Sequence, residues 1–254
     1  MARAIEFDEW GRLVLTDGIA FGPPFATVCP GDLQEGDVLV WYSSDLDWKT
    51  AAIQEFSQGP FSHVGIYVGE GWSVDAGPVA VSDASICDLT ANFAYGWVFR
   101  NPSLTPDQRS VIVQAALSNV GRSYAWVDAI TLPFRRRAFY ADMTRMHRWN
   151  WVAIMGKGLI ALRKFWKPSS KKTFCSRMVI EAFATIGHFS PEDSMACAHT
   201  PFDLAANTFF EPIGWLCKSK CPVWHPFDPY SPQRVTQKRW AFSPMRIWFA
   251  KEGG

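Results

Sequence analysis

Runs and alternation of apolar residues predict an antiparallel sheet in the first half of the chain. The turn residues of GDLQEGD lead into an apolar run at 38–42, which predicts a strand. A second run, FSHVGIYVG, ends at the turn-forming pair Glu70-Gly71, and WSVDA follows, so these segments predict a β-hairpin. VAVSD, YGWVFR and EPIGWLC predict further strands.

Helical periodicity appears between and after these strands. DLDWKTAAIQEFSQG and LTPDQRSVIVQAALSNVG predict two helices, the second with Thr105 as its N-cap. Apolar residues at helical spacing predict another helix over about 174–186, with Thr173 as its N-cap and Cys175 in its first turn. HTPFDLAAN predicts a short helix. The mixture predicts an α+β fold in which an antiparallel sheet packs against helices, including the one that carries Cys175.

The composition is that of a folded protein: 254 residues, of which 48% are hydrophobic and 19% charged. We interpret residues 1–254 as a single domain with a Pro-rich, aromatic C-terminal extension at 222–254, whose role the sequence leaves open. Acids stand where a signal peptide would have its apolar stretch, and no run reaches the ~20 apolar residues of a membrane span. We therefore expect synthesis in the cytoplasm, and action at a membrane or the cell envelope would then follow non-classical secretion.

Positive charge is concentrated in residues 131–172, which hold 11 Lys or Arg and one acid, Asp142, although the whole chain has a net charge of +1. Basic and aromatic residues interleave there in a mostly helical composition, which is typical of an interfacial amphipathic helix. We interpret the segment as a helical insertion. A helical cap with solvated charges is the alternative, and no fold motif supports nucleic acid as a partner. The expected contacts with an anionic membrane or substrate surface are Arg135, Arg136, Arg137, Arg148, Trp149, Trp151, Arg163, Lys164 and Trp166.

The six cysteines do not have the spacing of a disulfide framework. Cys217 and Cys221 form a local pair, and together with His225 they offer a conceivable zinc site. Because the spacing matches no standard zinc finger, we expect no metal and no cofactor.

Three residues have the chemistry of a nucleophilic site. A cysteine in the first turn of a helix lies beside free backbone N–H groups and the positive end of the helix dipole, which favour the thiolate. His63 and Asp75 lie on the two strands of the predicted hairpin, near its open end, where both side chains can face the same side. A carboxylate beside an imidazole fixes its tautomer, so Cys175, His63 and Asp75 form a candidate triad.

GDVLVWY, FSHVGIYVGEGWSVDA and TFCSRMVIEAFATIG together resemble the NlpC-type branch of the papain-like superfamily. The histidine segment comes first, as in the circularly permuted YiiX-type members, which are related to lecithin:retinol acyltransferase-like enzymes. The resemblance spans residues 31–206 and implies a permuted papain-like fold. It also implies that Cys175 is the nucleophile, His63 the base and Asp75 the third polar residue, a position often held by His or Glu in relatives.

The resemblance implies a cysteine hydrolase that works through an acyl-thioester. The backbone N–H of Cys175 is the expected oxyanion donor, with Tyr42 or Ser43 as a second donor. The basic aromatic insertion favours membrane acyl-lipids as substrate, by hydrolysis or acyl transfer. Alternatives are a peptidoglycan endopeptidase or amidase, and a catalytically inactive binding module. If the protein is a secreted antibacterial effector, an inhibitory partner protein is also expected.

Overall fold

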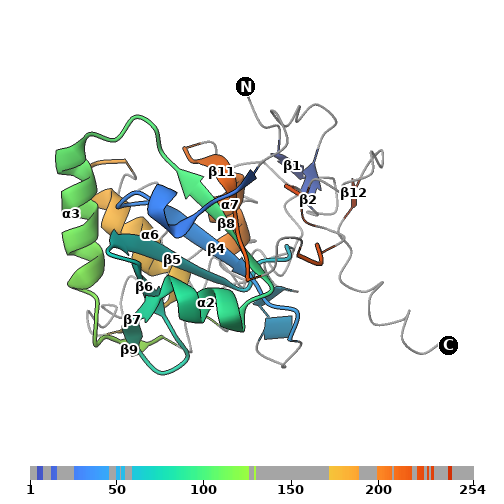
Figure 1. The fold of residues 1–254 in the computed structure, drawn as a ribbon, viewed down its shortest axis with the longest axis horizontal. Helices are drawn as coiled ribbons and strands as arrows, with labels where there is room; N and C mark the ends of the chain where they lie inside the picture. The colour runs from blue at the N-terminus through green and yellow to red at the C-terminus, as the bar shows by residue number, and fades with distance from the viewer. Residues whose placement is uncertain are drawn as a thin grey trace, which may run out of the picture.

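The fold was analysed in a computed structural model (Figure 1). It describes residues 5–7, 13–15, 26–45, 50–51, 53–54, 59–125, 129, 172–188, 199–207, 209–218, 222–225, 228, 230–231 and 240–241. A mixed sheet lies between helices, which confirms the α+β class predicted from the sequence. A helix was also predicted near residue 50. Of that segment, residues 50–51 and 53–54 are described as helical.

The main sheet has seven strands in the order β3-β11-β8-β4-β5-β6-β7. Neighbouring strands are antiparallel, except that β3 and β11 are parallel. The strand bounds are β3 Ala26–Thr27, β4 Val38–Tyr42, β5 His63–Gly69, β6 Trp72–Ala76, β7 Val81–Ser85, β8 Tyr95–Arg100 and β11 Glu211–Leu216. Each segment predicted to be a strand therefore contributes to this sheet.

Helices cover both faces of the sheet. On one face, α3 (Pro106–Leu117), α6 (Cys175–Ala184) and α7 (Pro201–Ala206) pack against the central strands. The short helix α2 (Ile86–Asn92), which the pattern did not predict, packs its buried Ile86 and Leu89 on the other face. Successive residues of β4 alternate between the two resulting core clusters. Because both faces are buried, β4 is a continuous apolar run rather than an alternating one.

The β5–β6 hairpin closes at residues 70 and 71, as predicted. Glu70 has φ 51° and Gly71 has φ 78°, the positive values that a tight two-residue hairpin turn requires. The strands are paired so that Gly65 lies opposite Asp75. The first residue of β5 and the last residue of β6 therefore lie together at the open end of the hairpin.

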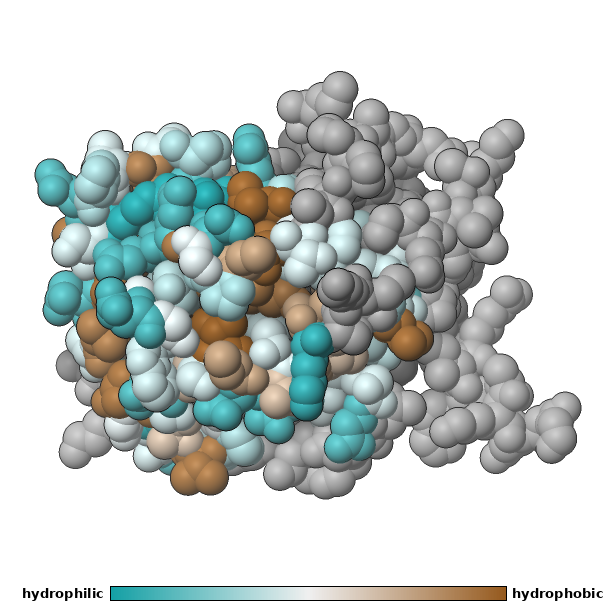
Figure 2. Space-filling view, viewed as in Figure 1, coloured by the Kyte–Doolittle hydropathy of each residue, from teal (hydrophilic) through white to brown (hydrophobic). Residues whose placement is uncertain are grey.

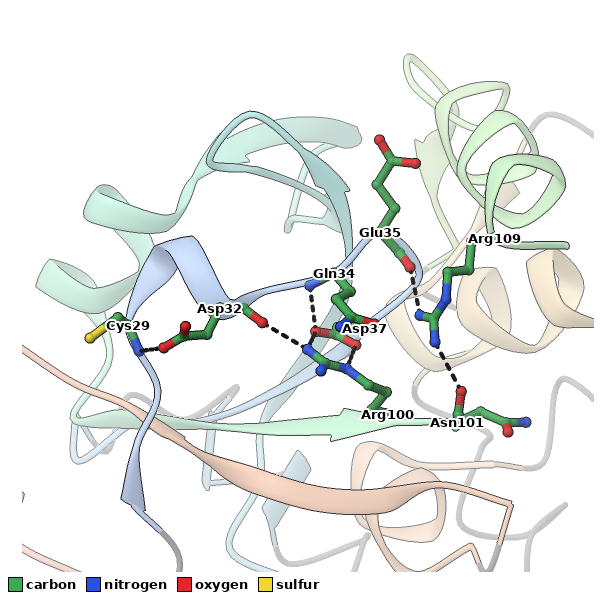
Figure 3. Close-up of polar contacts among 8 residues, drawn as sticks. All are labelled: Cys29, Asp32, Gln34, Glu35, Asp37, Arg100, Asn101 and Arg109. Carbon is green, nitrogen blue, oxygen red and sulfur yellow. Dashed lines mark hydrogen bonds and ion pairs between the residues drawn. The ribbon is translucent and has the colours of Figure 1, made fainter. Parts of the chain in front are cut away.

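A polar cluster secures the opposite end of the sheet (Figure 3). The Asp37 carboxylate, which is fully buried, accepts hydrogen bonds from Arg100 Nε at 2.7 Å and Nη2 at 2.6 Å. Arg100 also donates to the Asp32 carbonyl, and Arg109 donates to the Glu35 and Asn101 carbonyls. These bonds tie β8 and α3 to the turn before β4, and Figure 2 shows hydrophilic surface between that turn and α3.

Two short ladders involve segments outside the main sheet. β9 (Ser123–Tyr124) and β10 (Lys172–Thr173) are parallel, and Ala125 N donates to Thr173 O at 2.8 Å. The described residues that flank the segment 126–171 are thus held side by side. A separate three-stranded sheet joins β1 (Ile5–Phe7), β2 (Leu13–Leu15) and β12 (Trp240–Ala241).

The first described part of the C-terminal extension, within 222–231, packs on the main core. Trp224 contacts the rings of Tyr95, Trp97 and Trp215, with centroids 4.8, 5.6 and 5.1 Å away. The buried Asp228 carboxylate accepts a hydrogen bond from Trp97 Nε1 at 2.8 Å. This part of the extension therefore completes the core, a role that the sequence had left open.

Candidate active site

The hairpin brings His63 and Asp75 into contact. His63 lies two residues before Gly65, the partner of Asp75, so the two side chains are diagonal neighbours on one face. His63 Nε2 is 3.3 Å from Asp75 Oδ1, and their side chains are 16% and 5% exposed. The contact therefore forms in a largely water-free environment, where a carboxylate acts strongly on an imidazole.

Cys175 is the first residue of α6, and its side chain is buried. The N-cap is Phe174, in an extended conformation without a side-chain cap. The prediction of Thr173 as N-cap was wrong, because Thr173 pairs with Tyr124 in the β9–β10 ladder. One residue of strand pairing thus shifts the helix start to the cysteine itself, where the backbone N–H groups have no partner within the helix.

His63 also interacts electrostatically with Cys175, the third residue of the candidate triad. Burial lowers the pKa of His63, but hydrogen bonds to Asp75 and Cys175 and the charges of both outweigh burial and raise this pKa to about 10. Nε2 is the ring nitrogen that faces Asp75. The structure thus brings the three predicted side chains within electrostatic reach of one another.

An aromatic ring, which the sequence analysis missed, covers His63. Phe93 lies parallel to the imidazole, with an interplanar angle of 7° and ring centroids 5.5 Å apart. Trp41 stacks on Phe93 with centroids 5.5 Å apart. Phe93 follows α2, 30 positions beyond His63 in the numbering, so no local pattern signals the contact.

Tyr124 is a second residue that the sequence analysis missed. It ends β9, beside Thr173 and next to the start of α6. Burial, followed by the charge of Cys175, raises the pKa of Tyr124 above that of free tyrosine. The phenol therefore lies within the electrostatic reach of the sulfur and stays protonated at neutral pH.

The expected oxyanion donors Tyr42 and Ser43 have other contacts. The Tyr42 ring packs on Tyr95 and His225, with centroids 5.0 and 5.1 Å away, and burial raises its pKa. Ser43 Oγ accepts a hydrogen bond from Asp45 N. Their oxyanion role stays a prediction.

The expected membrane-contact residues between Arg135 and Trp166 lie outside the described residues, so their role stays a prediction. Among the helices that are described, none has the length and apolar character to cross a membrane. Within the same parts of the chain, no three His, Cys, Asp or Glu side chains group as metal ligands do. Cys221, the possible partner of Cys217, also lies outside them.

Comparison with known proteins gives one related sequence. No protein-family model matches the chain. Residues of this chain align with the probable lipoprotein peptidase YaeF of Escherichia coli K12 at 29% identity over 162 residues, covering 62% of this chain and 57% of that protein. The chain thus spans little more than half the length of this relative.

A solved structure of the metalloprotein YiiX from Escherichia coli O157:H7 is also similar. The alignment of the two structures has a TM-score of 0.38 and a sequence identity of 17%. It covers 60% of this chain and 65% of the YiiX chain.

Proposed function

We propose that the protein is a cysteine-dependent acyl hydrolase, with Cys175 as nucleophile, His63 as general base and acid, and Asp75 as the residue that orients His63. The observation that carries the proposal is that the imidazole of His63 contacts a buried carboxylate and interacts electrostatically with a cysteine at a helix N-terminus. The relative named a probable lipoprotein peptidase supports a hydrolase.

The proposed reaction has two halves. The thiolate of Cys175 attacks the carbonyl carbon, an S–C bond forms, and the carbonyl electron pair moves to oxygen. The bond to the leaving group then breaks, and that group takes a proton from His63. Water adds to the thioester after giving a proton to His63, the C–S bond breaks, and the acid leaves.

The oxyanion formed in each half needs hydrogen-bond donors. The backbone N–H of Cys175 is one candidate, because it has no helical partner at the first position of α6. The phenol of Tyr124 is a second candidate, because Tyr124 pairs with Thr173 beside the start of α6. Removing one oxyanion donor typically lowers kcat by about 100-fold or more, so Tyr124→Phe is a sensitive test of this assignment.

Membrane acyl-lipids are the proposed substrates. Residues 126–171, which contain most of the basic aromatic segment, leave and rejoin the described fold at the β9–β10 ladder, directly before Cys175. Val79, which is 81% exposed, accepts a hydrogen bond from Tyr124 N through its carbonyl. Apolar surface at the turn between β6 and β7 is visible in Figure 2. A basic aromatic segment that directly precedes the Cys175 helix in the sequence suits a substrate embedded in an anionic bilayer.

Peptide substrates are the second candidate, favoured by the printed name of the YaeF relative. One assay separates the two. The protein and its Cys175→Ala variant are incubated with anionic phospholipid vesicles, an acylated peptide and purified peptidoglycan. Cys175-dependent release of fatty acid from vesicles supports the lipid proposal, and new peptide termini support the peptide candidate. Absence of Cys175-dependent release from every substrate would count against the hydrolase itself.

A further inference from the structure

Gly65 occupies a position in β5 where glycine has no backbone reason to be. Glycine weakens the interior of a strand, and its usual justification is a positive φ. Gly69 and Gly71 have such values, 98° and 78°, whereas the φ of Gly65 is not positive. The reason for glycine at 65 therefore lies in its surroundings.

The Asp75 carboxylate fills the space that a side chain at 65 would need. A Cβ on Gly65 would lie 1.8 Å from Asp75 Oδ1 and 2.7 Å from both Asp75 Cγ and Ser73 Oγ. Protein Cβ atoms essentially never approach other heavy atoms closer than 3.0 Å. Even alanine at 65 would therefore displace the carboxylate.

Few other contacts hold that carboxylate. Asp75 is buried and meets His63 Nε2 at 3.3 Å, but within the described parts of the chain neither carboxylate oxygen has a hydrogen bond of good geometry. The buried Ser73 Oγ likewise has no hydrogen-bond partner there. The position of Asp75 thus depends on the space above Gly65 and on the ion pair with His63.

We propose that Gly65 is a positioning residue. Because it has no side chain, the Asp75 carboxylate can occupy the space above it and stay in contact with His63. Its catalytic consequence rests on the proposed function, since a displaced Asp75 no longer orients the base. This position of the Asp75 carboxylate does not depend on a substrate. It can therefore be tested on the resting protein.

The test is Gly65→Ala with the His63 imidazole followed by ¹⁵N NMR across pH. The titration midpoint of His63 is expected to fall from about 10 by at least about one pH unit, because the carboxylate that favours the imidazolium has moved. Gly69→Ala is the matched control, with the same substitution at the other end of β5. It strains a residue with φ 98° and should lower Tm while leaving the His63 titration unchanged.

A second arm covers the case in which Gly65→Ala folds poorly. In the Asp75→Ala background the carboxylate is gone and only the close contact with Ser73 Oγ remains, so Gly65→Ala should lower Tm much less there than it does when Asp75 is present. An equal loss of Tm in both backgrounds, or an unchanged His63 titration in Gly65→Ala, would overturn the proposal. A wild-type protein that shows no hydrolysis would count against the proposed function but would not overturn this proposal, because neither readout uses a substrate.

Discussion

The imidazole of His63 lies face to face with the ring of Phe93, with an interplanar angle of 7° and centroids 5.5 Å apart. A benzene face attracts a cation, and the pKa of His63, raised to about 10, keeps the imidazole positively charged at neutral pH. Phe93 therefore adds to the effect of the carboxylate of Asp75 from a different direction. The stack also links the base to Trp41 and so to the sheet core.

Replacing Phe93 by leucine should lower the pKa of His63 by about 0.4 to 0.7 units, because a cation–π contact contributes about 0.5–1 kcal/mol. Leucine is chosen since it keeps an apolar cover over the imidazole. The measurement is the ¹⁵N NMR titration of His63. Phe93→Tyr, which retains the aromatic face, should titrate as wild type does, and a leucine variant that does the same would exclude the cation–π contribution.

The pH dependence of stability follows from the raised pKa of His63. The folded-state pKa of about 10 lies above the ordinary value of 6.5, so this group stabilises the fold fully below about pH 6.5 and loses that contribution as pH rises toward 10. Asp75→Asn removes the main cause. We expect the Tm difference between wild type and Asp75→Asn to be largest near pH 6 and to shrink by pH 10. A difference that grows with pH would contradict the ion pair.

Arg100→Met should lower stability without altering the chemistry of the site. It leaves the fully buried Asp37 carboxylate without its bidentate partner, which typically costs about 3–5 kcal/mol. The loss is measured by urea unfolding, and the His63 titration of the folded variant should match that of wild type. A shifted titration would mean that the two ends of the sheet are coupled.

Replacing Arg135, Arg136 and Arg137 by alanine should weaken binding to anionic vesicles. Each well-placed basic residue contributes about 1 kcal/mol, and the contribution decreases with added salt. Vesicle sedimentation at low and high salt measures the effect, and neutral vesicles are the control. Unchanged binding at low salt would remove the support that this segment gives to a lipid substrate.

Local signals made most of the site predictable. The turn at Glu70 and Gly71 sets the hairpin register, and that register alone brings His63 and Asp75 to one end. Helical periodicity after Thr173 located Cys175 in a first turn. Each inference needed only a stretch of neighbouring residues.

Non-local contacts supplied what the sequence could not reveal. Phe93 and Tyr124 are distant in sequence from the site residues that they approach, and no periodic pattern of residues predicts such contacts. Thr173 has the propensity of an N-cap, but the hydrogen bond from Ala125 N to its carbonyl and the pairing with Tyr124 hold it in a strand. Tertiary pairing overrode local preference there.

The central claim is that Cys175 carries the acyl group during turnover. The most direct measurement is mass spectrometry of the protein, quenched in acid a few milliseconds after it is mixed with an ester or acyl-lipid that it hydrolyses. We predict an added acyl mass on the peptide that contains Cys175, labile to hydroxylamine as a thioester is, and its absence in Cys175→Ala. Turnover with no acyl group on that peptide, or turnover that persists in Cys175→Ala, would contradict the account.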